Sequence, residues 1–146
     1  MIRKCYTLIE MVAVTAILLT LLGVAILQFR PEYADQSPRQ VAEAIRRTGA
    51  GCRRQSTATG EISELFFDPE RKTITSSTER FRLPKEMRIL LNGGEIREKT
   101  PILCFFPDGS AAEAELELEL ESDGDRVKLR VSPLTGMMEI DENNAK

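Results

Sequence analysis

The sequence predicts an α+β protein in which a long N-terminal helix continues into a second helix that packs on antiparallel β-sheet. Three observations predict this class. Residues 8–29 form an apolar run, residues 41–52 carry an apolar stripe at helical spacing, and residues 114–121 and 126–131 alternate apolar with polar side chains. Apolar residues recur every three to four positions in a surface helix and every second position in a half-buried strand.

The apolar run is long enough to cross a bilayer. At about 1.5 Å per residue, 11–29 nearly covers a hydrocarbon layer of about 30 Å. Arg3 and Lys4 precede the run and no basic residue follows before Arg30, so the positive-inside rule predicts a cytoplasmic N-terminus. A plain signal anchor fits this pattern equally well. A cleaved secretory signal does not, because its apolar core spans only about 7–15 residues.

Glu10 is the feature that a plain anchor does not explain. A carboxylate in an apolar segment costs roughly 2.5–3.5 kcal/mol near the membrane centre and less near the interface. An anchor gains nothing from that cost. Ionisable residues in such segments usually mark a function, so Glu10 is the first candidate functional residue.

The residues around Glu10 resemble a known signal. A short basic leader followed by YTLIEM at 6–11 is similar to the class III signal of type IV pilins and type II secretion pseudopilins. The resemblance implies that a prepilin peptidase cuts between Cys5 and Tyr6 and methylates Tyr6. It also implies that Glu10 neutralises the amine of Tyr6 on a neighbouring subunit. The family nearly always has glycine before the cut, so Cys5 predicts cleavage that is slow, absent or left to a tolerant enzyme.

Composition argues against catalysis. The chain of 146 residues has no His, a formal net charge of −3, and neither a CxxC pair nor a glycine-rich phosphate loop. The commonest routes to metal and nucleophilic chemistry are therefore closed, and we expect no enzyme, no cofactor and no metal. An acidic chain is also a poor electrostatic match for nucleic acid.

A second helix follows the apolar run. Pro31 is expected to kink or end the first helix, and Ser37-Pro38 is typical of a new helix start. Glycines at 49 and 51 predict an end between residues 50 and 55. The apolar stripe of this helix consists of Val41, Ile45, Thr48 and Cys52.

Arginines gather on the other faces of this helix, between Arg46 and Arg54. We expect them to form a solvated face that pairs with the carboxylates of the sheet. The alternative is a binding patch for anionic lipid or DNA.

Beyond Gly60 the pattern becomes that of strands and turns. Turns are predicted at 68–71, 92–94, 107–109 and 132–136, where Pro, Gly, Asp and Asn cluster. Residues 101–106 are apolar on both faces, as in a strand buried on both sides. The predicted strands are 61–67, 72–76, 81–83, 87–91, 101–106, 114–121, 126–131 and 137–140.

The strands 114–121 and 126–131 are expected to form a hairpin closed by a two-residue turn at Asp123-Gly124. That register places Leu118 opposite Leu129 and pairs each glutamate with a cation across the strands, as Glu119 with Lys128. We interpret the acidic run as a solvated strand face, in preference to a calcium or catalytic site.

Cys52 and Cys104 form a candidate disulfide. If the helix packs on the sheet through its stripe, both thiols can point into one interface. A bridge would close a loop of about fifty residues and contribute roughly 4 kcal/mol in the chain-entropy model. We favour the alternative, two thiols that behave as small hydrophobes, because disulfide geometry is demanding.

The C-terminal half adds a second resemblance. ILCFFPDGS at 102–110 and PLTG at 133–136 are similar to the end of H-type minor pseudopilins and FimT-like minor pilins. The implied fold is pilin-like, with an N-terminal helix whose periplasmic half packs on antiparallel sheets. The implied organisation is a leader at 1–5, a transmembrane and assembly helix at 6–30, the periplasmic half of the helix at 31–55, a β-rich domain at 56–141 and a frayed tail at 142–146.

The function implied is mechanical. The leading interpretation is a minor pseudopilin that assembles through its N-terminal helix into the periplasmic pseudopilus of type II secretion. Its expected partners are other pseudopilin or pilin subunits, the prepilin peptidase and the inner-membrane assembly platform. Its expected location is the inner membrane, as a single span with the C-terminal domain in the periplasm. The alternatives are a minor pilin of a type IV pilus, for adhesion, motility or DNA uptake, and a signal-anchored periplasmic binding domain that never polymerises.

Overall fold

The computed structural model describes residues 8–28, 36–122 and 124–141, with the backbone alone at 22–28. It divides into two units, Met1–Pro31 and Glu32–Lys146. The first unit contains helix α1 (Leu8–Gln28), and the second begins with helix α2 (Pro38–Thr59). The predicted continuation of one helix into the other falls on residues 29–35, together with Pro31, and lies outside the described residues.

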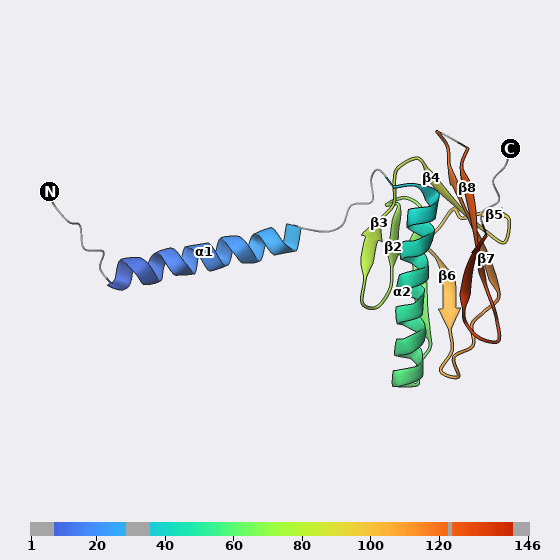
Figure 1. Cartoon of the computed structure of the whole chain (residues 1–146), viewed down its shortest axis with the longest axis horizontal. Coiled ribbons are helices and arrows are strands. Elements are labelled where there is room, and N and C mark those ends of the chain that lie inside the picture. The colour runs from blue at the N-terminus through green and yellow to red at the C-terminus, as the bar shows by residue number, and fades with distance from the viewer. Residues whose placement is uncertain (1–7, 29–35, 123, 142–146) are drawn as a thin grey trace. The chain divides into compact units, whose positions relative to one another are not determined.

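The second unit combines α2 with two antiparallel sheets (Figure 1). In the first sheet the strand order is β3-β2-β1-β6, and in the second it is β5-β4-β7-β8-β9. The α+β prediction is therefore confirmed. The strands of the first sheet are β1 (Ser63–Asp68), β2 (Thr73–Thr75), β3 (Arg80–Arg82) and β6 (Thr100–Phe105). Those of the second are β4 (Met87–Leu91), β5 (Gly94–Glu95), β7 (Ala114–Leu120), β8 (Arg126–Val131) and β9 (Met138–Asp141).

Helix α2 begins where the sequence predicts and ends later. Ser37 and Gln40 form a reciprocal capping box with Pro38 at the first helical position. The helix passes both glycines and continues to Thr59, where Gly60 caps it at a φ of 74°. The predicted end between residues 50 and 55 is wrong. Glycine costs a helix only about 1 kcal/mol, and packing of the helix on the sheets offsets a cost of that size.

At Gly49, α2 lies close to a strand of each sheet. A Cβ at this position would lie 2.7 Å from Met138 Cε on β9 and 3.4 Å from Phe105 Cζ on β6. A larger residue there would separate the helix from both strands, so the glycine that suggested a helix end instead permits close packing.

The core lies between α2 and the two sheets. The predicted stripe of Val41, Ile45, Thr48 and Cys52 is buried along α2, which contacts strands of both sheets. Ile102 and Leu103 are buried in succession, as predicted for a strand covered on both faces. The largest fully buried side chains include Phe67, Phe105, Leu65, Ile74, Met87, Leu116, Leu118 and Leu129.

The hairpin of β7 and β8 forms, but the predicted register is wrong by two residues. Leu118 lies opposite Val127, and Glu119 opposite Arg126. The cause is the loop: the Leu120 N–H donates to the Asp125 carbonyl at 3.1 Å, so four residues replace the predicted two-residue turn. Asp123 itself lies outside the described residues. Because side chains alternate with a period of two, a shift of two leaves the leucines inward and the glutamates outward.

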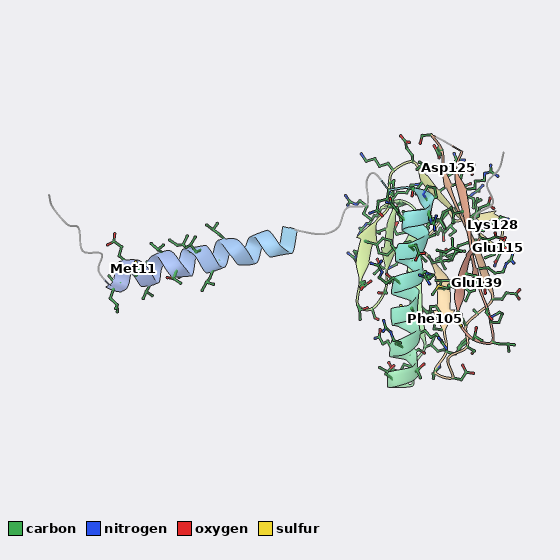
Figure 2. All side chains as sticks on the ribbon, in the orientation of Figure 1. Met11, Phe105, Glu115, Asp125, Lys128 and Glu139 are labelled. Carbon is green, nitrogen blue, oxygen red and sulfur yellow. The ribbon has the colours of Figure 1, made fainter. Side chains whose placement is uncertain are left out.

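The outward face of this hairpin is a ladder of ion pairs, as predicted. Arg126 Nη2 lies 2.8 Å from Glu119, and Lys128 Nζ lies 3.3 Å from Glu115 (Figure 2). Hydrogen bonds from Lys128 and from Arg130 lower the pKa of the Glu115 carboxyl. The glutamates of the acidic run are therefore paired with cations of the same sheet.

Candidate functional site

Helix α1 is apolar on every side. The described side chains of its first fourteen residues include nine large apolar ones that are 49–87% exposed. A helix that is apolar all round normally lies inside a protein core or a membrane. An apolar surface of this size is normally buried against lipid or protein, which makes α1 the first candidate interaction site. Those nine residues are Leu8, Ile9, Met11, Val12, Val14, Ile17, Leu18, Leu19 and Leu21.

Two threonine hydroxyls of α1 are satisfied within the helix itself. Thr15 Oγ1 donates to the Met11 carbonyl at 2.7 Å, and Thr20 Oγ1 donates to the Ile17 carbonyl at 2.8 Å. Such bonds to the preceding turn hide a hydroxyl from an apolar environment. Glu10 is the one ionisable residue between Leu8 and Gln28. It lies exposed in the first turn, where the helix dipole favours a negative charge.

The structure does not describe the two residues of the predicted processing site. Cys5 and Tyr6, the candidate peptidase cut and the candidate methylation site, lie outside the described residues. Within the described part of the chain, no helix is both long enough and apolar enough to count as a membrane span.

The two predicted cysteines do not form a disulfide, and both are free thiols. Cys52 lies beside Ser63, which is opposite Phe105, whereas Cys104 is opposite Glu64. Since neighbouring strand residues point to opposite faces, Cys104 faces away from the helix that carries Cys52.

Burial favours the protonated form of both thiols. It is the main cause of the raised pKa of Cys52, which the nearby Ser63 and Ser76 hydroxyls partly oppose. Burial also raises the pKa of Cys104, and the charge of Glu64 adds to the effect. The thiolate is the reactive form of cysteine, so a buried Cys52 and a half-buried Cys104 agree with the favoured alternative of two thiols that behave as small hydrophobes.

The arginines between Arg46 and Arg54 form no ion pair with a carboxylate of the sheet in the described residues, contrary to the prediction. Arg46 pairs with Glu43 on its own helix at 2.8 Å, and Arg53 Nε donates to the Gly109 carbonyl at 3.1 Å. Arg47 and Arg54 are exposed and have no ion pair with any residue that the structure describes. The glutamates of β7 pair instead with cations of β8.

Arg53 holds together two turns that are distant in sequence. Its side chain lies within 4 Å of the Cβ positions of both Gly109 and Gly136, and the Ala111 N–H donates to the Pro133 carbonyl at 2.9 Å. The motifs at 102–110 and 133–136 therefore meet at one place. Sequence reasoning found both turns but not their contact, since nothing in their spacing marked Arg53.

Gly136→Ala is expected to destabilise the second unit by about 2–4 kcal/mol. Gly136 has a φ of 62°, and a Cβ there would lie 2.7 Å from the Gly109 carbonyl oxygen, which combines backbone strain with a clash. Denaturant unfolding of the full chain measures the loss. The control is Gly51→Ala, where a Cβ meets nothing within 4 Å and a gain of about 0.5–1 kcal/mol is expected. Equal effects at both sites would contradict the close approach of the turns.

No metal site is found in the described residues, where no three Cys, Asp or Glu side chains are grouped to hold an ion. The expectation that the chain needs no cofactor stays a prediction.

One capped helix packed on two antiparallel sheets, preceded in sequence by an apolar helix with a single early glutamate, defines a pseudopilin-like fold. No family model and no curated protein sequence matches the chain. Among solved structures, it is similar to the minor pseudopilin EpsH from the Type 2 Secretion System of Vibrio cholerae, with a TM-score of 0.58. The match covers 75% of this chain and 99% of that chain at 9% sequence identity, and at such identity it shows the fold alone.

Proposed function

We propose that this chain is a minor pseudopilin-like structural subunit that assembles through α1 into the periplasmic pseudopilus of type II secretion. The observation that carries the proposal is α1 itself, apolar on every described side and carrying Glu10 as its one ionisable residue. The fold likeness to a type II minor pseudopilin supports it. The role is mechanical, and the chain has no chemistry of its own.

In this proposal the apolar surface of α1 has two successive environments. The segment 6–30 first lies in the inner membrane, with Arg3 and Lys4 on the cytoplasmic side and the second unit in the periplasm. On assembly, the same surface packs against the helices of neighbouring pseudopilin subunits. Glu10 then neutralises the amine of Tyr6 on a neighbour, which offsets the cost of keeping either charge in an apolar environment. The prepilin peptidase and the assembly platform are the other partners.

The mature N-terminus tests the proposal. N-terminal sequencing and mass measurement of the membrane-extracted protein are expected to give methylated Tyr6. An N-terminus at Met1 would instead favour a signal-anchored periplasmic domain that never polymerises.

Cys5→Gly is expected to raise the rate of cleavage by a prepilin peptidase, because the pocket before the cut favours the smallest residue. Pulse-chase labelling of the two forms in one host measures that rate. Cys5→Leu serves as the matched control and is expected to be cut more slowly than either. Cleavage at a position other than before Tyr6 in all three forms would reject the signal assignment.

A further inference from the structure

The second sheet ends in a strand with an open edge. Among the described strands, β9 pairs with β8 alone. The Ser132 N–H donates to the Met137 carbonyl at 2.8 Å, and the register with β8 continues without a break to Asp141. In an antiparallel ladder every second residue bonds to the same neighbour, so the backbone N–H and C=O groups of Met138 and Ile140 point away from β8. An added strand would bond to groups of this kind.

A groove with a basic wall lies at the beginning of this strand. It has a volume of about 350 Å³ and runs between one face of α2 and the residues that lead into β9. We call it the edge groove. Its lining includes Arg47, Arg54, Gly136, Met137 and Met138. The helix side spans residues 43–54, about 16 Å at 1.5 Å per residue, which matches about five residues of extended chain.

Two arginines of the edge groove are available to a ligand. Of the four arginines in its lining, two already have partners on this chain. The other two, Arg47 and Arg54, are exposed and have no ion pair with a residue that the structure describes. Met137 beside them is 62% exposed. The groove therefore offers two positive charges and an apolar side chain next to the open edge of β9.

The outer face of β9 sets a second condition on a ligand. Glu139 and Asp141 are exposed, and they point to the face of the sheet opposite Met138, because successive strand residues alternate. A like charge directly across two strands is destabilising. A chain that lies along β9 is therefore favoured when its groove-facing residues are acidic and the residues between them are not.

We propose that the edge groove binds an extended, acidic segment of a partner protein, which adds to the second sheet as a strand beside β9. The backbone of this segment bonds to the outward N–H and C=O groups of Met138 and Ile140. Its alternate carboxylates pair with Arg47 and Arg54, and its apolar atoms cover Met137. The inference goes beyond the proposed function and uses the second unit alone, so it does not depend on assembly through α1.

Duplex DNA fits this surface less well than an acidic peptide segment. A duplex has no peptide backbone to pair with the open edge of β9. The carboxylates of Glu139 and Asp141 on that strand also repel a polyanion, as does a chain with a formal net charge of −3.

Fluorescence anisotropy with the full chain in detergent tests the proposal. The probe is a labelled peptide of about seven residues in which glutamate and threonine alternate, so that one face of the extended chain is acidic. We expect saturable binding. Arg47→Gln with Arg54→Gln is expected to weaken it about tenfold, which is the effect of two partly exposed ion pairs. No saturable binding of the probe would overturn the proposal.

A matched double variant separates the groove from general attraction. Arg80→Gln with Arg97→Gln removes the same charge at two exposed arginines that lie outside the edge groove and outside β9. This variant is expected to bind the probe as the wild-type chain does. Equal weakening by the two double variants would show attraction without a site and overturn the proposal.

Two N-methylated forms of the probe test the added strand itself. One form is methylated at the glutamates and the other at the threonines, so each keeps the charge and loses one alternate set of N–H donors. A strand beside β9 directs only one of these sets toward it. One form is therefore expected to lose binding and the other to keep it. If both forms bind as well as the parent probe, the segment does not pair with β9 and the proposal is wrong.

The remaining outcomes assign a failure to the right level. Duplex DNA that binds the full chain more tightly than the probe, and is lost on Arg47→Gln with Arg54→Gln, would give the groove a different occupant and overturn the proposal. A full chain that binds the probe as expected but never enters filaments would support this inference and overturn the proposed function.

Discussion

Glu10→Ala is expected to lower the entry of this chain into filaments by roughly a hundredfold while leaving its membrane insertion intact or improved. A carboxylate in an apolar segment costs about 2.5–3.5 kcal/mol, so alanine removes a penalty during insertion. In the proposed filament the same carboxylate would offset the charge of a neighbouring N-terminal amine. Loss of an interaction of that size corresponds to about two decades in an equilibrium constant.

Membrane fractionation and co-purification with partner subunits separate the two effects. Glu70→Ala, which removes an exposed carboxylate from the loop between β1 and β2, is the matched control and is expected to behave as wild type in both assays. Glu10→Ala protein that co-purifies with its partners as well as wild type does would show that Glu10 has no assembly role.

Phe105→Ala is expected to cost about 3–5 kcal/mol of unfolding free energy, the range found for large-to-small changes at buried aromatic residues. Phe105 on β6 (Figure 2) is 0% exposed, and its Cζ lies 3.4 Å from the Cβ position of Gly49 on α2. Its backbone carbonyl accepts a hydrogen bond from Ser56 Oγ at 3.1 Å. The substitution therefore opens a cavity where the helix, the first sheet and β9 meet.

Small domains are stable by only about 5–15 kcal/mol, so much of the Phe105→Ala population should unfold near physiological temperature. Denaturant unfolding of the full chain measures the loss. Phe66→Ala on β1 is the matched control, because this half-buried ring lies on the opposite face of the same sheet. Its expected cost is smaller, about 1–2 kcal/mol. If the two variants lose the same stability, the core does not centre on Phe105.

Local patterns in the sequence predicted most of the fold because each was short and chemically specific. Ser37-Pro38 fixed the start of α2, and Asn92-Gly93 gave a two-residue turn in which both residues have positive φ. The alternating leucines and glutamates fixed which faces of β7 and β8 point inward. Each of these features depends on residues only a few positions apart.

The errors fall where distant contacts decide the outcome. Gly49 packs against Met138. Packing of this kind offsets the cost of glycine in a helix, so α2 continues past its predicted end. A longer loop moved the β7–β8 register by two residues, which alternation alone does not detect. Cys104 points to the face of its sheet away from Cys52, and which face it occupies depends on the register of β6 with β1.

The candidate site divides in the same way. Glu10 stands out in the sequence because a charge in an apolar run is visible without a structure. The contact of Arg53 with the turns at Gly109 and Gly136 does not, because only folding brings these residues together. The prediction that the arginines between Arg46 and Arg54 pair with carboxylates of the sheet failed for the same reason, because it depends on which strands lie beside α2.

Photo-cross-linking from α1 tests the central claim most directly. A photoreactive residue in place of Val14, which is about half exposed on α1, is introduced into the full chain in its own host. Our account predicts adducts with the N-terminal helices of pilin-like subunits, and loss of those adducts when Glu10→Ala is added. Adducts with lipid alone, equally abundant with and without Glu10, would contradict assembly through α1.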